Sequence, residues 1–156
     1  MSKIVQFTIR VYAIIFNQNA EILLSDEFAL GMPITKFPGG GMEFGEGTID
    51  CLHREAMEEF GQDLDVLDHF YTTDFFQAAI TRPEFQLVSI YYFAKLKEKP
   101  KFKISSVPNV SPVQIEGDIA FRWFPVHMLC ADTMTLPIDK IVAEKINKWF
   151  FENKSV

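Results

Sequence analysis

Hydrophobic and polar residues alternate along residues 6–16. In an extended chain Phe7, Ile9, Val11, Ala13 and Ile15 share one side, and Tyr12, Ile14 and Phe16 share the other. This period-two pattern predicts a strand that is covered on both faces near its end. The next residues, 17–19, have turn chemistry, so residues 21–25 are expected to return as the second strand of a hairpin.

The rest of the chain reads as further strands and two helices. Strands are expected at residues 34–37, 66–76, 87–94 and 119–124, and helices at residues 48–60 and about 137–151. Thr48 is the expected N-cap of the first helix, Gly61 its stop, and Pro137 suits the first turn of the second. Three consecutive glycines, residues 39–41, predict a tight loop, and three prolines predict a long loop over residues 98–118. This order indicates an α/β (α+β) fold in which helices cover a mixed β-sheet.

Composition sets the class of the protein. The 156 residues fit one domain, 1–156, with 48% apolar and 23% charged residues. We expect a cytoplasmic protein, because the N-terminal residues lack the apolar run of a secretion signal and no apolar stretch is long enough to span a membrane. Two cysteines suggest free thiols rather than a disulfide framework. A net charge of −6 argues against a long nucleic acid as partner but allows a small anionic ligand brought in by cations.

The first helix carries the candidate chemistry. At about 100° per residue its apolar stripe is Ile49, Leu52, Ala56 and Phe60, while Glu55, Glu58 and Glu59 share an adjoining arc. Like charges at this spacing repel by about 0.2–0.5 kcal/mol per pair, and Arg54 is placed to pair with only one of them, Glu58. A divalent cation such as Mg²⁺ or Mn²⁺ would offset the remaining charge. The alternative is a solvated acidic face on a surface helix.

The surrounding residues favour the metal. Gly40, Glu46, Arg54-Glu55, Glu58-Glu59 and Gly61 stand at fixed gaps that resemble the Nudix box of the Nudix (MutT-like) hydrolases. The entry Phe37-Pro38-Gly39-Gly40 is also similar to that family. Gln62 departs from the aliphatic residue that the family has at that position. The resemblance covers residues 40–62 and implies a Nudix-type α/β/α sandwich.

The resemblance implies a role for each matching residue. Glu58 and Glu59 would bind Mg²⁺ or Mn²⁺, with Glu55 as a further ligand or as the group that orients or deprotonates the attacking water. Arg54 would position these carboxylates, Glu46 would brace the loop and helix through Arg54, and the Gly39 carbonyl would be another metal ligand. Glu116 and Asp118 are candidates for a loop acid that completes the site, or ordinary loop acids. Phe76 is a candidate for stacking on the substrate, although aromatic residues more often belong to the core.

The implied reaction is metal-dependent hydrolysis of a pyrophosphate bond in a nucleoside diphosphate linked to another moiety, such as a nucleoside triphosphate or a nucleoside diphosphate sugar. Two alternatives stay open: a Nudix-type module that binds a nucleotide without cutting it, and an acidic helix for protein interaction. Alternating lysines from Lys95 to Lys103 could meet phosphates or form a charged sheet edge. The expected partner is a small nucleotide, with no membrane and no long nucleic acid, and a homodimer is left open.

Overall fold

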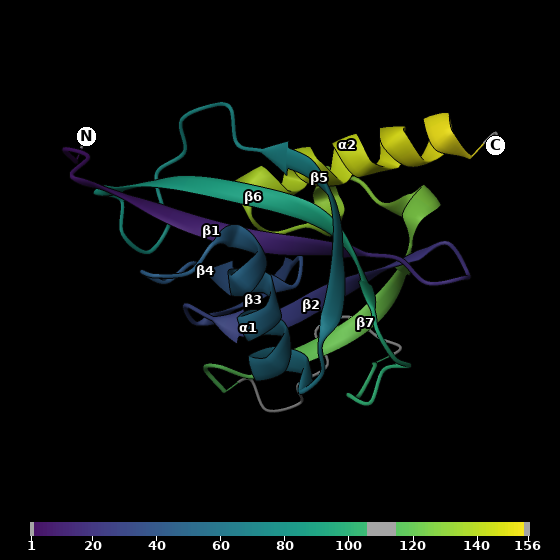
Figure 1. Ribbon diagram of the computed structural model, residues 1–156. Helices are drawn as coiled ribbons and strands as arrows, with labels where there is room; N and C mark the ends of the chain where they lie inside the picture. The colour runs from purple at the N-terminus through teal and green to yellow at the C-terminus, as the bar shows by residue number, and fades with distance from the viewer. Residues whose placement is uncertain (1, 106–114, 155–156) are drawn as a thin grey trace. The chain divides into compact units, whose positions relative to one another are not determined.

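The computed structural model describes residues 2–105 and 115–154 of the chain (Figure 1). It divides into two compact units. The first unit consists of Met1–Ile14 and Pro38–Phe102, and the second consists of Ile15–Phe37 and Lys103–Val156. Each unit is built around its own β-sheet, so the expected α+β class is confirmed, but the strands form two sheets.

The first unit contains a four-stranded sheet in the order β4-β1-β6-β5 and the helix α1. Its elements are β1 (Gln6–Ile15), β4 (Gly39–Gly41), α1 (Thr48–Phe60), β5 (Leu64–Thr72) and β6 (Phe85–Leu96). The helix contacts β4 and β5, as Figure 1 shows. Gly61 ends α1 in a left-handed conformation with φ 66°, as its position in the sequence predicts.

Three local expectations for this unit are wrong. The three glycines form the strand β4, paired antiparallel with Arg10–Tyr12 of β1, because this pairing offsets the entropic cost of ordering glycine. Thr48 is the first helical residue, and Gly47 is the N-cap, whose N–H donates to the Asp50 carboxylate at 2.8 Å. Ile49 is 48% exposed, and Cys51 is buried instead, since its arc of the helix lies against β4.

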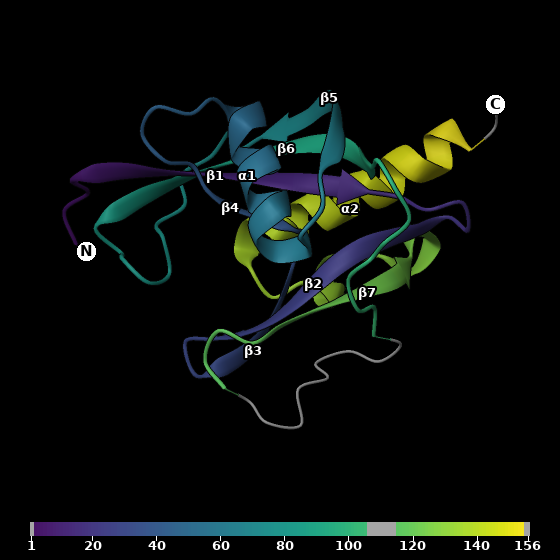
Figure 2. The same cartoon turned by 60° about the horizontal axis from the view of Figure 1, so that its bottom comes forward.

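The second unit contains a three-stranded sheet in the order β3-β2-β7 (Figure 2). Its strands are β2 (Glu21–Ala29), β3 (Met32–Lys36) and β7 (Ile119–Pro125), followed by the short helices η1 (Val126–Met128) and η2 (Ala131–Thr133) and the helix α2 (Pro137–Asn153). The expected turn at residues 17–19 is present. The expected hairpin is present next to the turn, where the antiparallel bridge Phe16–Ile22 and a hydrogen bond from the Asn17 N–H to the Glu21 carbonyl join the two segments. Along its length, however, β2 pairs with β3 and β7 and not with β1.

A buried ion pair fixes the centre of the second sheet. Arg122 on β7 donates through Nε to Asp26 on β2 at 2.6 Å, and the Thr35 hydroxyl on β3 donates to the same carboxylate at 2.6 Å. The apolar residues Ile138, Val142 and Ile146 form the buried stripe of α2, while Ile141 is exposed. Part of the expected long loop, residues 106–114, lies outside the described residues. Within the described part of the chain, no helix is long and apolar enough to cross a membrane.

Candidate active site

Arg54 lies at the centre of the acidic cluster on α1. Its Nε and Nη2 donate to the two carboxylate oxygens of Glu46 at 3.0 and 2.7 Å, which makes a bidentate pair. Its Nη1 donates to Glu55 at 3.1 Å and to Glu58 at 3.2 Å, so the predicted pairing with Glu58 is confirmed. Its Nη2 also donates to the carbonyl of Gly41 at 2.8 Å. One guanidinium therefore joins β4, the loop before α1 and two glutamates of the helix.

This network shifts the protonation of its members. The hydrogen bonds from Arg54 and from the Glu43 backbone lower the pKa of Glu46 from 4.5 to about 2. The same bonds with Glu46 raise the pKa of Arg54 further above its ordinary value. Burial raises the pKa of the neighbouring Cys51 thiol to about 12. Glu46 and Arg54 are thus held as a charged pair, and Cys51 is held as a neutral thiol.

The glycine strand lets the helix approach β4 closely. A Cβ on Gly40 would lie within 3.0 Å of the Glu55 carboxylate, so a larger residue there would displace Glu55. Gly39 has φ +141°, and a Cβ on it would lie within 3.0 Å of the Val11 carbonyl oxygen and the Tyr12 backbone. Gly39 therefore requires glycine, and a side chain at Gly40 would have to push the end of Glu55 aside, which gives a structural reason for the Gly39-Gly40 entry to the box.

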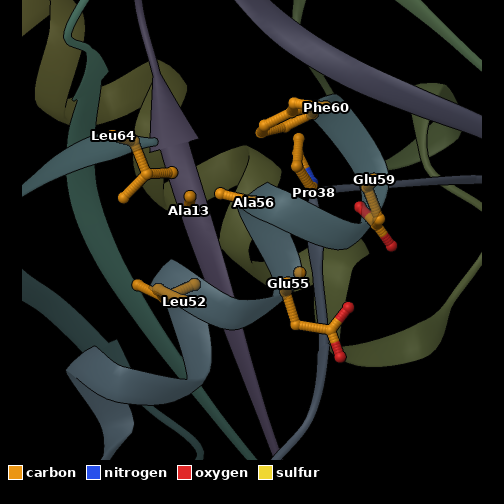
Figure 3. Close-up of a pocket in the computed structure, with 9 residues that line it drawn as sticks. Ala13, Pro38, Leu52, Glu55, Ala56, Glu59, Phe60 and Leu64 are labelled. Carbon is orange, nitrogen blue, oxygen red and sulfur yellow. The ribbon is translucent and has the colours of Figure 1, made fainter. Parts of the chain in front are cut away.

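A small cleft opens between α1 and the strands of the first unit. Its cavity volume is about 10 Å³, enough for about one water molecule, and it is partly open to solvent. Gly39, Glu55 and Glu59 line it together with apolar residues. The apolar lining consists of Ala13, Pro38, Leu52, Ala56, Phe60 and Leu64. Figure 3 shows the carboxylates of Glu55 and Glu59 on the same side of α1. Glu55 is held more firmly than Glu58, since their side chains are 13% and 57% exposed.

The donor chemistry of this cleft fits a hard divalent cation. Carboxylates one helical turn apart stand beside a strand edge, and Mg²⁺ and Mn²⁺ prefer oxygen ligands. Backbone hydrogen bonds join Ala13 to Pro38 and Ile9 to Met42 across the β1–β4 pair. Because hydrogen-bonded and non-hydrogen-bonded pairs alternate in an antiparallel ladder, the carbonyls of Gly39 and Gly41 point away from β1. Among residues 2–105 and 115–154, no group of three or more His, Cys, Asp or Glu side chains is gathered closely enough to hold a metal.

The predicted substrate residues are not among those that line this cleft. Phe76 is in the loop between β5 and β6, 58% exposed, and does not line the cleft. Glu116 and Asp118 belong to the second unit. There Glu116 accepts hydrogen bonds from the backbone N–H groups of Leu30 and Gly31 at 2.6 and 3.2 Å, which gives it a structural task in the turn between β2 and β3. Their roles in a substrate site stay predictions.

Two residues within the box, Cys51 and Gln62, make contacts that the sequence pattern does not predict. The Cys51 thiol lies 3.8 Å from the Gly40 carbonyl and 3.7 Å from Arg54 Nη2. Gln62, the departure from the Nudix box, is buried, and its amide holds the backbone of the segment after β6. The bond between the thiol and Gly40 depends on tertiary packing, so no local pattern could have predicted it. For Gln62, the available signal in the sequence was that a glutamine stands where the family has an aliphatic residue.

Comparison with known proteins places the chain in a family. The NUDIX domain matches residues 6–149. A NUDIX hydrolase from Nitrosomonas europaea has a similar structure, with a TM-score of 0.65 and 16% identity over 92% of this chain and 89% of that one. An ADP-ribose pyrophosphatase from Streptococcus suis 89-1591 gives a TM-score of 0.61 and 21% identity over 95% and 92%. A MutT protein from methicillin-resistant Staphylococcus aureus 252 gives 0.57 and 25% over 96% and 99%.

The fold is that of a Nudix-type domain. The chain belongs to the NUDIX domain family, whose match extends over most of its length. It is an enzyme of the Nudix hydrolase class, as the box predicts. The similar structures establish the fold.

Proposed function

We propose that this protein hydrolyses a pyrophosphate bond in a nucleoside diphosphate linked to another moiety, with Mg²⁺ or Mn²⁺ as cofactor. The observation that carries the proposal is that Glu55 and Glu59 line one cleft, beside the edge of β4 at which backbone carbonyls point away from β1. Arg54 binds both Glu55 and Glu58 next to this cleft. This cluster concentrates negative charge on one side of α1. A pyrophosphate is itself negative, so it can approach this side only together with cations.

Each residue of the cluster has an assigned role. Glu58 and Glu59 would hold the metal, together with the Gly39 carbonyl at the edge of β4. Glu55, confined between Gly40 and Arg54, would be a further ligand or would orient and deprotonate the attacking water. Arg54 positions these carboxylates, and Glu46 fixes Arg54 through its bidentate pair. The metal, when bound, neutralises phosphate charge and acidifies a bound water.

The glutamates can be tested with conservative variants. Glu59→Gln and Glu58→Gln each remove a charged oxygen donor and keep the shape of the side chain, so we expect turnover to fall by at least about a hundredfold while the fold persists. Glu152→Gln, an exposed glutamate on α2, is the matched control and should keep full activity. The measurement is release of phosphate products with Mg²⁺ from nucleoside triphosphates, ADP-ribose and nucleoside diphosphate sugars. Wild-type turnover in Glu59→Gln would contradict the ligand assignment.

The same panel separates the alternatives. A nucleotide-sensing module would bind a member of the panel without releasing product. An acidic helix for protein interaction would show no change in melting temperature when Mg²⁺ or Mn²⁺ is added. The proposed site predicts a metal-dependent rise in melting temperature that Glu59→Gln reduces, because a ligand that binds only the folded state stabilises it. Phe76→Ala, Glu116→Gln and Asp118→Asn test the proposed substrate residues through KM.

A further inference from the structure

Charge balance at the candidate site calls for a second fixed cation. Arg54 is committed to Glu46, Glu55, Glu58 and the Gly41 carbonyl, so its charge serves the protein's own carboxylates. A substrate phosphate that is not bound by metal would still need a positive partner. A second cation that lies against the glycine strand is Arg10, whose guanidinium is near Gly41.

Arg10 faces the glycine strand from the side opposite to α1. It is the cross-strand partner of Gly41 in the β1–β4 pair, and its Nη1 lies 3.8 Å from the position that a Cβ on Gly41 would take. The next glycine, Gly40, faces Glu55 instead, because successive residues of a strand point to opposite faces. Arg10 and Glu55 thus flank the two faces of a strand only three residues long. A ligand that crosses the free edge of β4 can meet both.

The guanidinium of Arg10 is held in place by tyrosines. Its Nε donates to the Tyr12 hydroxyl at 2.7 Å, and its Cζ lies 5.7 Å from the centre of the Tyr12 ring. Tyr12 is itself buried and stacks on Tyr91 with ring centres 5.2 Å apart. This support aims a planar group with several N–H donors along the sheet face toward Gly41, whose lack of a side chain leaves room above β4. Such a fork suits phosphate oxygens, which it can bind with two bonds.

We propose that Arg10 binds a phosphate of the substrate other than the one attacked, on the face of β4 opposite to α1. The proposal rests on the proposed function, because it assumes that a nucleoside diphosphate group lies across the edge of β4. It assigns to Arg10 a role in binding and to Tyr12 a positioning role. Loss of Arg10 therefore weakens substrate binding more than it slows the chemical step.

The test compares two arginines that both stack on an aromatic ring. Arg10→Met should raise KM for MgATP, or for the best substrate of the panel, by about tenfold or more with kcat changed far less, because a charge-assisted hydrogen bond is lost. Arg10→Lys should give an intermediate KM, since lysine keeps the charge but not the fork. Arg82→Met removes an arginine that lies 5.1 Å from the Phe85 ring and serves as the matched control with unchanged KM. Unchanged KM in Arg10→Met and Arg10→Lys would overturn the proposal.

Two further measurements keep the outcome clear. Titration calorimetry with ADP and Mg²⁺ measures binding directly, and Arg10→Met should bind about tenfold more weakly than the wild type. Tyr12→Phe removes the hydroxyl that holds Nε and should raise KM in the same direction, whereas a purely structural role would lower the melting temperature and leave KM unchanged. If no substrate of the panel is cut but ADP binding still depends on Arg10, hydrolysis fails and the Arg10 assignment stands. Equal ADP binding by wild type and Arg10→Met would overturn it.

Discussion

The ion pair between Glu46 and Arg54 makes the stability of the site depend on pH. The folded state lowers the pKa of Glu46 from 4.5 to about 2, so its carboxylate stabilises the fold fully above pH 4.5 and loses this contribution as the pH falls toward 2. We predict that the gap in free energy of unfolding between wild type and Glu46→Gln is constant near neutral pH and closes below pH 4.5. Urea denaturation across this range measures it. In an Arg54→Met background the gap should lose most of its pH dependence, while the hydrogen bond from the Glu43 N–H keeps the rest. A gap that persists at the lowest pH would contradict the pairing.

Adjacent glycines of β4 should differ sharply in their tolerance of a side chain. A Cβ on Gly40 would overlap the Glu55 carboxylate, whereas a Cβ on Gly41 would make only ordinary contact with Arg10. We expect Gly40→Ala to lower the free energy of unfolding by about 1–3 kcal/mol, the usual cost of overpacking. Gly41→Ala, the matched control, should stay within about 0.5 kcal/mol of the wild type. Urea denaturation measures both, and equal stability of the two variants would show that Glu55 moves aside freely.

At the scale of elements, the helix α1 was predictable and the strand β4 was not. The apolar period and Gly61 fix the limits of α1, and its span Thr48–Phe60 agrees with the expectation. The same period predicts Glu55, Glu58 and Glu59 on one arc of the helix. The structure supports this arc, because Arg54 binds Glu55 and Glu58, and Glu55 and Glu59 line the same cleft. The glycines of β4 form a strand only because β1 supplies hydrogen-bonding partners. Such partners are distant in sequence, so local preference predicts a loop.

Gln62 ties the end of α1 to the segment that follows β6. Its amide oxygen accepts from the Lys101 N–H at 2.8 Å, and its amide nitrogen lies 3.4 Å from the carbonyls of Glu98 and Lys99. We predict that Gln62→Leu, which introduces the aliphatic residue of the Nudix box, destabilises the protein by about 1–3 kcal/mol, because the part-buried backbone groups that Gln62 binds lose their partner. Thermal and urea unfolding measure the loss. Gln18→Leu, at an exposed turn position, should have little effect, and a Gln62→Leu variant as stable as the wild type would assign the segment's stability to other contacts.

At the scale of the whole molecule, chain order and spatial order differ. Each compact unit combines two separate stretches of sequence, so the chain passes between units after Ile14, Phe37 and Phe102. A strand that follows a turn is normally expected to pair with its predecessor, yet β1 and β2 enter different sheets. For the same reason, the sequence could not show that Glu116 and Asp118 belong to a different unit from the box. The family match, over residues 6–149, spans both units at once.

The two cysteines provide a reporter for each unit. Cys51 in the first unit is fully buried beside Gly40, and burial raises its pKa to about 12, while Cys130 in the second unit is exposed. Because the thiolate is the reactive form, we predict that an aromatic disulfide reagent at pH 8 modifies Cys130 rapidly and Cys51 only when the first unit opens. Cys130→Ser should therefore remove the fast reaction of the native protein, and urea should expose one further thiol. Rapid labelling of native Cys130→Ser would mean that the contact of α1 with β4 opens readily, and the arginine-centred site would then be assembled only part of the time.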